Sequence, residues 1–153
     1  MKEQIPEFNE NGLLPPGKHL AGIEDIAARF GGSKSLKRSQ LTKNLKSFYN
    51  FIKYYCKAIY VDGSYVTNKI SPNDVDLLII FPSDFKPNVM VHMRFMEFTV
   101  DYQKYKLHAF SFFEGKDDKK INEFFEYFTH TDPDRNPDVG RVEKGIISVE
   151  CEK

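Results

Sequence analysis

The stretch from residue 61 to residue 81 constrains the fold of this chain more than any other. It reads VDGSYVTNKISPNDVDLLIIF, in which a Gly-Ser turn and a nine-residue spacer lead to two aspartates and a long apolar run. An apolar run of this length, ended by Pro82, predicts a buried strand. Because side chains two apart on a strand share one side, Asp74 and Asp76 should aim both carboxylates at one point, with Val75 buried opposite.

The residue types around this strand favour metal and phosphate chemistry. Mg²⁺ prefers oxygen ligands and is usually held by one or two carboxylates together with substrate phosphates. The turn at Gly63 and Ser64 offers backbone N–H groups and a hydroxyl to phosphate oxygens, which glycine lets approach closely. We therefore predict Mg²⁺ (or Mn²⁺) at Asp74 and Asp76, beside a phosphate site. Lys69 in the spacer could reach a triphosphate, although a solvated lysine is the simpler interpretation.

The combination of Gly63-Ser64, spacer and Asp74-x-Asp76 resembles the signature of the DNA polymerase β-like nucleotidyltransferase superfamily. Members transfer a nucleoside monophosphate from a triphosphate to an acceptor with the help of two metal ions. The resemblance implies a nucleotidyltransferase-like α+β fold, with a small mixed β-sheet and helices packed mainly on one face. It also implies a nucleoside triphosphate substrate and catalytic, metal-binding roles for the two aspartates.

A second resemblance extends over nearly the whole chain. Residues 5–19 read IPEFNENGLLPPGKH, which is similar to the leader of a family of small bacterial proteins that precedes a nucleotidyltransferase-like core. Those proteins commonly end in a loop rich in aspartate and arginine, followed by a Lys-Gly-Ile strand. The matching segments here are residues 132–136 and 144–147.

The chain departs from the superfamily at the third carboxylate. Active members carry that acid in an apolar-acid-apolar pattern on the strand corresponding to residues 107–113, where this chain reads leucine-histidine-alanine around His108. Histidine is a poor Mg²⁺ ligand, but it can act as a base near neutral pH or accompany Mn²⁺. Loss of activity is another interpretation. If the strand register differs, the acid is one of Glu97, Asp101 and Glu114.

Three further features of the sequence each have a structural and a functional interpretation. Asp62 precedes the Gly-Ser turn, and we favour a cap of the following helical turn over a metal ligand. The basic run at residues 34–38 is favoured as a solvated helix start over a nucleic-acid patch. The aromatic residues between 110 and 128 are expected to be mostly core, with stacking on a base as the alternative.

Length and periodicity set the expected organisation. The chain has 153 residues, which fits one domain, and we predict an extended N-terminal arm at residues 1–19 and a single domain at 20–153. Predicted helices cover about 22–30, 34–55, 88–103 and 119–128, and predicted strands cover 58–61, 75–81, 107–113 and 145–149. In the third helix the spacing of Val89, Met93, Met96 and Val100 predicts the inner face.

Charge and size limit the partners. The 22 basic and 22 acidic residues cancel, which argues against a generic nucleic-acid binder, although a nucleic-acid partner stays open. The apolar run at 75–81 is too short for a membrane span and residues 1–20 are polar, so we predict a cytoplasmic protein without a membrane partner.

The small size leaves no room for an acceptor domain, so we predict a protein or small-molecule acceptor, or a partner protein that completes the site. By analogy with similar minimal proteins, a toxin–antitoxin or defence setting is plausible. The alternative is a catalytically inactive module of the same fold that binds a nucleotide or a partner.

Overall fold

A computed structural model describes residues 5–32 and 35–150 of the chain. Five strands form one mixed sheet in the order β1-β5-β2-β3-β4. The pairs β1–β5 and β3–β4 are parallel, and the pairs β5–β2 and β2–β3 are antiparallel. The strands are β1 (Gly17–Ala21), β2 (Ala58–Asp62), β3 (Val75–Phe81), β4 (Leu107–Phe113) and β5 (Gly145–Val149). The predicted α+β class with a small mixed sheet is confirmed.

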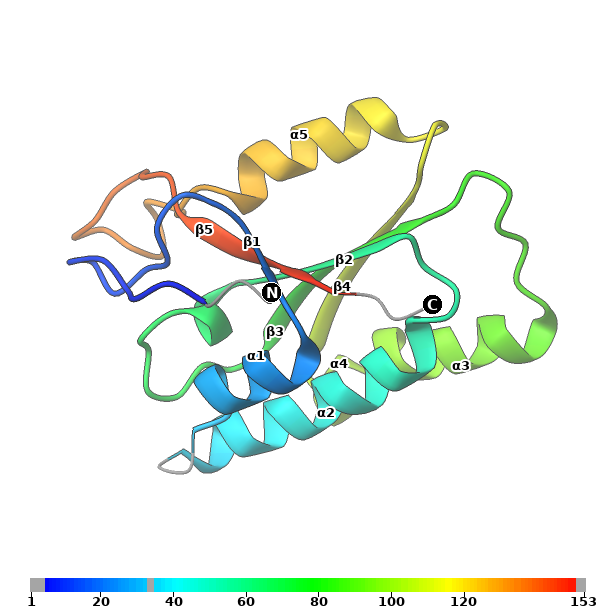
Figure 1. The fold of residues 1–153 in the computed structure, drawn as a ribbon, viewed down its shortest axis with the longest axis horizontal. Coiled ribbons are helices and arrows are strands. Elements are labelled where there is room, and N and C mark those ends of the chain that lie inside the picture. Colours follow the sequence, from blue (N-terminus) through cyan, green and yellow to red (C-terminus); the bar gives the residue numbers. More distant parts are fainter. Residues whose placement is uncertain (1–4, 33–34, 151–153) are drawn as a thin grey trace.

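The helices are divided unequally between the two faces of the sheet. They are α1 (Ile23–Phe30), α2 (Leu36–Ile52), α3 (Val89–Val100), α4 (Tyr102–Tyr105) and α5 (Asp118–Phe128), with a short 3₁₀ helix η1 at Ser64–Val66. Figure 1 shows α1 to α4 on one side of the sheet and α5 alone on the other. The predicted packing of helices mainly on one face is therefore confirmed.

The central strand β3 is buried on both sides, which explains its unbroken apolar run. Leu77 and Ile79 belong to the larger core beneath α1 and α2, whereas Leu78 and Ile80 pack in a smaller core beneath α5. Strand alternation places Asp76 on the same face as Leu78, the face that α5 covers. The aspartate pair thus lies at the end of the α5 face.

The predicted apolar face of the long helix is confirmed in α2. Leu41, Leu45, Phe48 and Ile52 are all buried, at the spacing expected for one helix face. The helix begins after Ser35, whose side chain accepts a hydrogen bond from the Arg38 N–H. It ends three residues earlier than predicted, at residue 52.

The prediction for residues 88–103 is wrong in two respects. The segment is broken at Asp101, whose side chain caps α4 by accepting from the Lys104 N–H. The predicted inner residues Val89, Met93, Met96 and Val100 are 73, 62, 42 and 65% exposed. The core face of α3 carries Phe95 and Phe98 instead, because the larger rings meet the aromatic side chains of α2.

The N-terminal leader contributes a strand that the sequence did not predict. From Ile5 the chain runs along the domain with Leu14 buried, and residues 17–21 then form β1 beside β5. Pro15 and Pro16 argue against a central strand, but β1 lies at the edge of the sheet, where such a neighbour is tolerated. The boundary between arm and domain at residue 19 stays a prediction.

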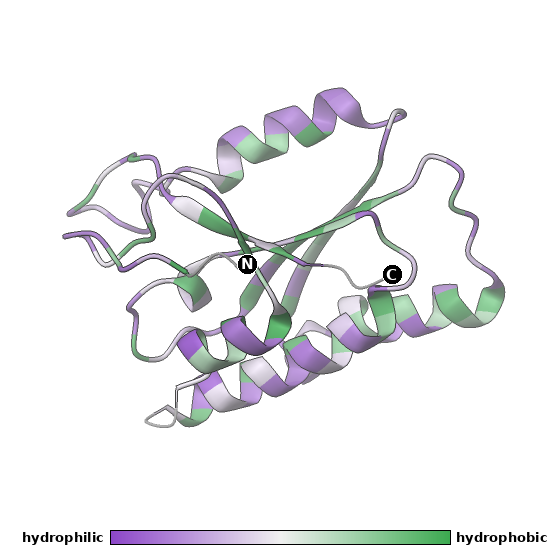
Figure 2. Cartoon of the chain, viewed as in Figure 1, coloured by the Kyte–Doolittle hydropathy of each residue, from purple (hydrophilic) through white to green (hydrophobic). Residues whose placement is uncertain are grey.

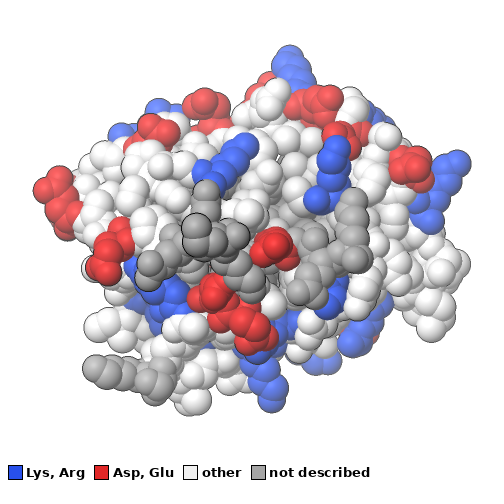
Figure 3. Space-filling model, viewed as in Figure 1, with Lys and Arg blue, Asp and Glu red and all other residues white. Residues whose placement is uncertain are grey.

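The surface and the helix lengths bear on possible partners. On the face drawn in Figure 3, basic and acidic side chains are interspersed over the surface. Within residues 5–32 and 35–150, no helix has the length and hydrophobicity to cross a lipid bilayer.

Candidate metal and nucleotide site

Three neighbouring strands place polar side chains in a row at one end of the sheet. Asp62 at the end of β2 pairs directly with Asp76 in β3, and Asp76 pairs directly with His108 in β4. Directly paired residues present their side chains on the same face of a sheet. The predicted register of the strand at 107–113 is therefore confirmed, and His108 stands beside the aspartate pair.

Asp74, Asp76 and His108 form a group that could hold a metal ion. Each offers a ligand atom, and these atoms all lie within 4.8 Å of one another. His108 Nδ1 is 3.2 Å from Asp76 Oδ1, and the His108 side chain is 55% exposed. In residues 5–32 and 35–150 this is the one such group of three or more His, Cys, Asp or Glu. Two carboxylates and an imidazole leave coordination positions open to a ligand.

The three alternative acids lie outside this group. Glu97 pairs with Arg94 at 3.1 Å on α3, and Glu114 pairs with Lys57 at the far end of β4. Asp101 caps α4. The interpretation that one of them replaces His108 is wrong, because the parallel register fixes which residue of β4 stands beside Asp76.

Negative charge is concentrated at Asp76. Burial, together with the neighbouring carboxylates of Asp74 and Asp62, raises the pKa of Asp76 to about 6, and His108 opposes the shift. Crowded carboxylates of this kind are stabilised by a proton or a cation placed between them. The electrostatics therefore fit a bound divalent ion.

Tyr102 orients the other aspartate, a contact that the sequence did not predict. Its hydroxyl donates a hydrogen bond of 2.9 Å to Asp74 Oδ2. Burial, the hydrogen bond to Asp74 and the charges of Asp74 and Asp76 raise the pKa of Tyr102, so the hydroxyl remains a donor. The break at Asp101 begins the short helix that carries this tyrosine.

On the other side of Asp76, Asp62 forms a buried ion pair with Lys144. Their side chains are only 5 and 11% exposed, and Lys144 Nζ donates to Asp62 Oδ1. Burial raises the pKa of Asp62, while Lys144 and the Gly63 N–H oppose that change. The predicted helix cap is wrong, because no side chain of the described residues caps η1, and the carboxylate is bound by the lysine just before β5.

Gly63 is required by its backbone and by Asp76. Its φ is +83°, in the region that favours glycine, and a Cβ at this position would overlap Asp76 Oδ2. From the sequence we expected that glycine is needed here so that phosphate can approach the backbone closely. The structure adds a second reason, which is the space taken by the Asp76 carboxylate. Any side chain at residue 63 would displace the Asp76 carboxylate.

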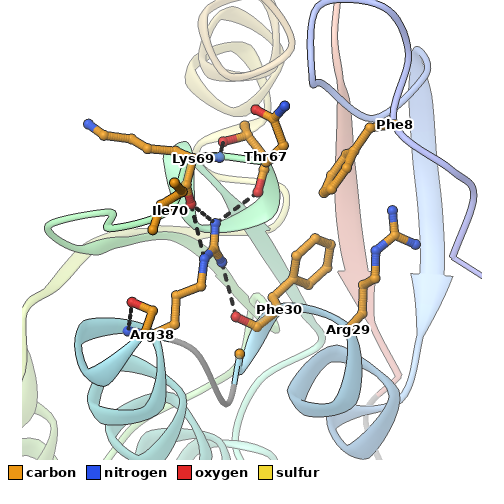
Figure 4. A pocket seen from close by; sticks show the side chains of 10 residues that line it. Phe8, Arg29, Phe30, Arg38, Thr67, Lys69 and Ile70 are labelled. Atoms are coloured by element: carbon orange, nitrogen blue, oxygen red, sulfur yellow. Dashed lines mark hydrogen bonds between the residues drawn. The ribbon is translucent and has the colours of Figure 1, made fainter.

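A buried arginine holds the loop that follows the Gly-Ser turn (Figure 4). Arg38 of α2 donates to the carbonyl oxygens of Phe30, Tyr65, Thr67 and Lys69, at 3.0, 2.7, 2.8 and 3.1 Å. The predicted solvated helix start is therefore wrong for Arg38, which is 7% exposed. The clamp fixes the backbone at Lys69, whose side chain is exposed.

All six predicted site residues line one cavity of about 1140 Å³: Gly63, Ser64, Lys69, Asp74, Asp76 and His108. Their roles in binding and catalysis stay predictions. The wall also includes Tyr127, one of the aromatic residues for which stacking on a base was the alternative, Arg135 of the loop rich in aspartate and arginine, and Arg141, which the sequence did not single out. Residues 11–13 of the leader complete it. A smaller cavity of about 280 Å³ shares the loop at residues 67–69 and is the one drawn in Figure 4.

Comparison with known proteins places the chain in a family. Residues 6–150 match the "Family of unknown function (DUF6932)". The chain belongs to DUF6932. No curated protein matches it. The DUF6932 region runs from the leader to the end of β5, so every residue of the candidate site lies within it.

One similar solved structure is the "Crystal structure of a putative nucleotidyltransferase from Sulfolobus solfataricus at 1.40 A resolution". It is 18% identical to this DUF6932 chain, with a TM-score of 0.34. The alignment covers 57% of this chain and 85% of that one.

Proposed function

We propose that this DUF6932 chain is a metal-dependent nucleotidyltransferase that moves a nucleoside monophosphate from a triphosphate to a protein or small-molecule acceptor. The observation that carries the proposal is the convergence of Asp74, Asp76 and His108 within 4.8 Å, in the same cavity as the Gly63-Ser64 turn. Small-molecule pockets commonly have volumes of about 300–1000 Å³. The cavity of about 1140 Å³ leaves room for an acceptor group beside a nucleotide.

The donor set fits a divalent ion held by Asp74 and Asp76. Mg²⁺ or Mn²⁺ bound there would neutralise the triphosphate and activate the acceptor oxygen. Ser64 and the backbone at Gly63 bind the outer phosphates in this proposal, and Lys69 contacts them from the loop that Arg38 clamps. Tyr102 keeps Asp74 oriented through its hydrogen bond.

His108 takes the position of the third acid as a general base. When Nδ1–H donates to Asp76 Oδ1, the other ring nitrogen, Nε2, keeps its lone pair and can accept a proton. The acceptor oxygen forms a bond to the α-phosphorus as the bond from that phosphorus to the bridging oxygen breaks. Pyrophosphate leaves with that oxygen, and the acceptor's proton passes to Nε2.

Transfer of label from α-³²P-labelled triphosphates tests this function directly. The wild-type protein is incubated with Mg²⁺ or Mn²⁺ and candidate acceptors, beside an Asp74→Ala/Asp76→Ala variant. Asp84→Ala, an exposed aspartate in the loop after β3, is the matched control. We expect transfer by the wild type and the control alone, and transfer that persists in the double variant would refute the site.

A second candidate is an inactive module that binds a nucleotide or a partner protein in the same cavity. The observation in its favour is His108, which stands where active members of the resembled superfamily carry an acid. Calorimetry with triphosphates separates the two, since binding without turnover supports the module and turnover removes it. A toxin–antitoxin or defence setting stays a prediction from resemblance under either function.

A further inference from the structure

The aromatic residues between 110 and 128 divide into a buried group and one exposed ring. All of them except Tyr127 pack in or against the two cores of the sheet: Phe110, Phe112, Phe113, Phe124, Phe125 and Phe128. Tyr127 is 61% exposed and belongs to neither core of the described residues. It lies on α5, along which Figure 2 shows both hydrophilic and hydrophobic colour. Most of this aromatic group is therefore core, and Tyr127 requires a separate explanation.

Tyr127 forms an aromatic wall of the large cavity together with Phe110 and Phe128. Phe128 is only 2% exposed, and the ring of Phe110 has His108 and Phe124 against it, with 4.5 and 4.6 Å between ring centroids. Within residues 5–32 and 35–150, the one ring contact of Tyr127 is with Phe124, at 5.9 Å and tilted by 57°. A single exposed aromatic ring is ordinary on a surface, but aromatic rings in a cavity wall commonly bind a ligand. Tyr127 is the ring of this wall that is open to one.

A row of ring contacts connects Tyr127 to the candidate metal site. His108 stands beside Asp76, and Phe110 follows two residues later on β4 with its ring against that of His108. Phe124 of α5 then contacts both Phe110 and Tyr127. The aromatic wall therefore begins on the β4 side of Asp76, whereas the Gly-Ser turn follows β2 on the other side. The cavity has a polar end at the turn and an aromatic end at this wall.

We propose that Tyr127 binds the base of the nucleoside triphosphate by stacking, a role that rests on the proposed nucleotidyl transfer. A nucleotide has the same division as the cavity, with a charged phosphate chain at one end and a flat ring at the other. With the outer phosphates at the Gly-Ser turn and the α-phosphate at the metal, the ribose and base extend toward the aromatic wall. Stacking on an aromatic side chain tolerates any base, because every base has a π-face. Tyr127 therefore adds affinity for the nucleoside without selecting strongly among the four bases.

Calorimetry of the full chain with Mn²⁺ tests this role by comparing a non-hydrolysable ATP analogue with inorganic tripolyphosphate, which has no base. We expect Tyr127→Ala to bind the ATP analogue about tenfold more weakly than the wild type does and to bind tripolyphosphate equally well. Tyr127→Phe keeps the ring and should bind both ligands like the wild type. Tyr54→Ala, at a 67% exposed tyrosine that lines neither cavity, is the matched control. The inference is overturned if Tyr127→Ala loses no affinity for the ATP analogue, if it loses as much for tripolyphosphate, or if Tyr127→Phe is equally weak.

A fluorescent reporter at the same position tests contact with the base directly. The chain has no tryptophan, so Tyr127→Trp introduces the only one. A base stacked on the indole ring should quench its emission, so the ATP analogue with Mn²⁺ should lower the signal and tripolyphosphate with Mn²⁺ should not. Tyr54→Trp, at the remote control position, should respond to neither ligand. Quenching of Tyr127→Trp by both ligands, or by neither, contradicts stacking.

Failure of the stacking role and failure of the proposed function give different results. If both are right, Tyr127→Ala transfers label from α-³²P-labelled ATP with a KM about tenfold above the wild-type value and a kcat close to it, because the lost contact binds the substrate and the transition state alike. If transfer occurs but the KM is unchanged, stacking is wrong and the function stands. If nothing transfers label while the base-dependent affinity persists, the function is wrong and stacking stands. A wild type that binds neither ligand overturns both.

Discussion

The two strands that flank Asp76 present opposite environments to it. On the β2 side, Asp62 is paired with Lys144 and its side chain is 5% exposed. On the β4 side, His108 contacts the same aspartate with its side chain 55% exposed. Both neighbours are in direct register with Asp76, so strand pairing alone does not set the difference. One side of the site is a fixed, buried support, and the other is open to a ligand.

The position of each strand in the sheet explains the contrast. β2 is flanked by β5, which is preceded by Lys144, and the leader packs against β5 through β1. β4 is the edge strand at the other end of the sheet, so no further strand of the described residues covers His108. An edge position is where a residue can meet solvent, a metal or an acceptor without unfolding the sheet. We therefore propose that Asp62 supports the site and that His108 takes part in the chemistry.

The largest expected loss of activity comes from changing Asp76, the aspartate that stands between the two sides. Asp76→Asn removes a ligand charge but keeps the shape of the side chain, so transfer of label should fall by at least about 10³-fold. Asp84→Asn changes a remote, exposed aspartate in the same way and should retain full activity. Comparable loss in both variants would mean that charge at Asp76 has no special role.

The β2 side should respond in stability. Lys144→Met leaves Asp62 buried without its partner, and we expect the free energy of unfolding to fall by about 3–5 kcal/mol in urea titrations. The double variant Asp62→Asn/Lys144→Met removes the stranded charge and should recover most of that loss. If the single and double variants are equally destabilised, charge pairing is not what Lys144 contributes.

The β4 side should respond in activity and leave stability almost unchanged. His108→Ala removes the proposed base from an exposed position, so the rate of label transfer should fall about 100-fold. The free energy of unfolding should stay within about 0.5 kcal/mol of the wild-type value. His108→Asp restores the acid of the resembled superfamily and should work better with Mg²⁺ than His108→Ala does. A large stability loss in His108→Ala would erase the contrast between the two sides.

The pKa of Asp76 predicts a pH dependence of metal affinity. Because the folded pKa is raised to about 6, a bound proton competes with the metal below that pH, and Mn²⁺ affinity should fall up to about tenfold per pH unit there. A raised folded pKa also means that the metal-free protein gains stability from this group as pH falls from about 7 to 4, and loses it as pH rises through 6. Calorimetric Mn²⁺ titrations at about pH 5, 6, 7 and 8 measure the first effect, and flat affinity contradicts it.

The sequence predicted the parts of the fold and site that depend on local pattern. The strand at 75–81 and the convergence of Asp74 and Asp76 follow from the period of two in a strand. The buried face of α2 follows from helical spacing. The place of His108 beside Asp76 was predicted only with the help of a family resemblance, and the sheet register confirmed it.

The features that the sequence did not predict depend on distant partners. Asp62 and Lys144 are 82 residues apart, and no local pattern relates them. Arg38 lies in a basic run, which usually faces water, yet it turns inward because the loop after Gly63 presents carbonyl oxygens that need donors. In α3 two apolar faces competed for the core, and spacing alone could not rank Phe98 above Met93.

Binding of Mn²⁺ is the most direct test of the central claim, that Asp74 and Asp76 hold a metal ion beside His108, at a site that takes a nucleotide. Calorimetry at about pH 7.5 would compare the wild type, Asp76→Asn and Asp84→Asn, each with and without a non-hydrolysable triphosphate. We expect the wild type and Asp84→Asn to bind Mn²⁺ more tightly with the triphosphate present, and Asp76→Asn to bind at least about 100-fold more weakly. Equal Mn²⁺ affinity in all three proteins, unaffected by the triphosphate, would contradict the account.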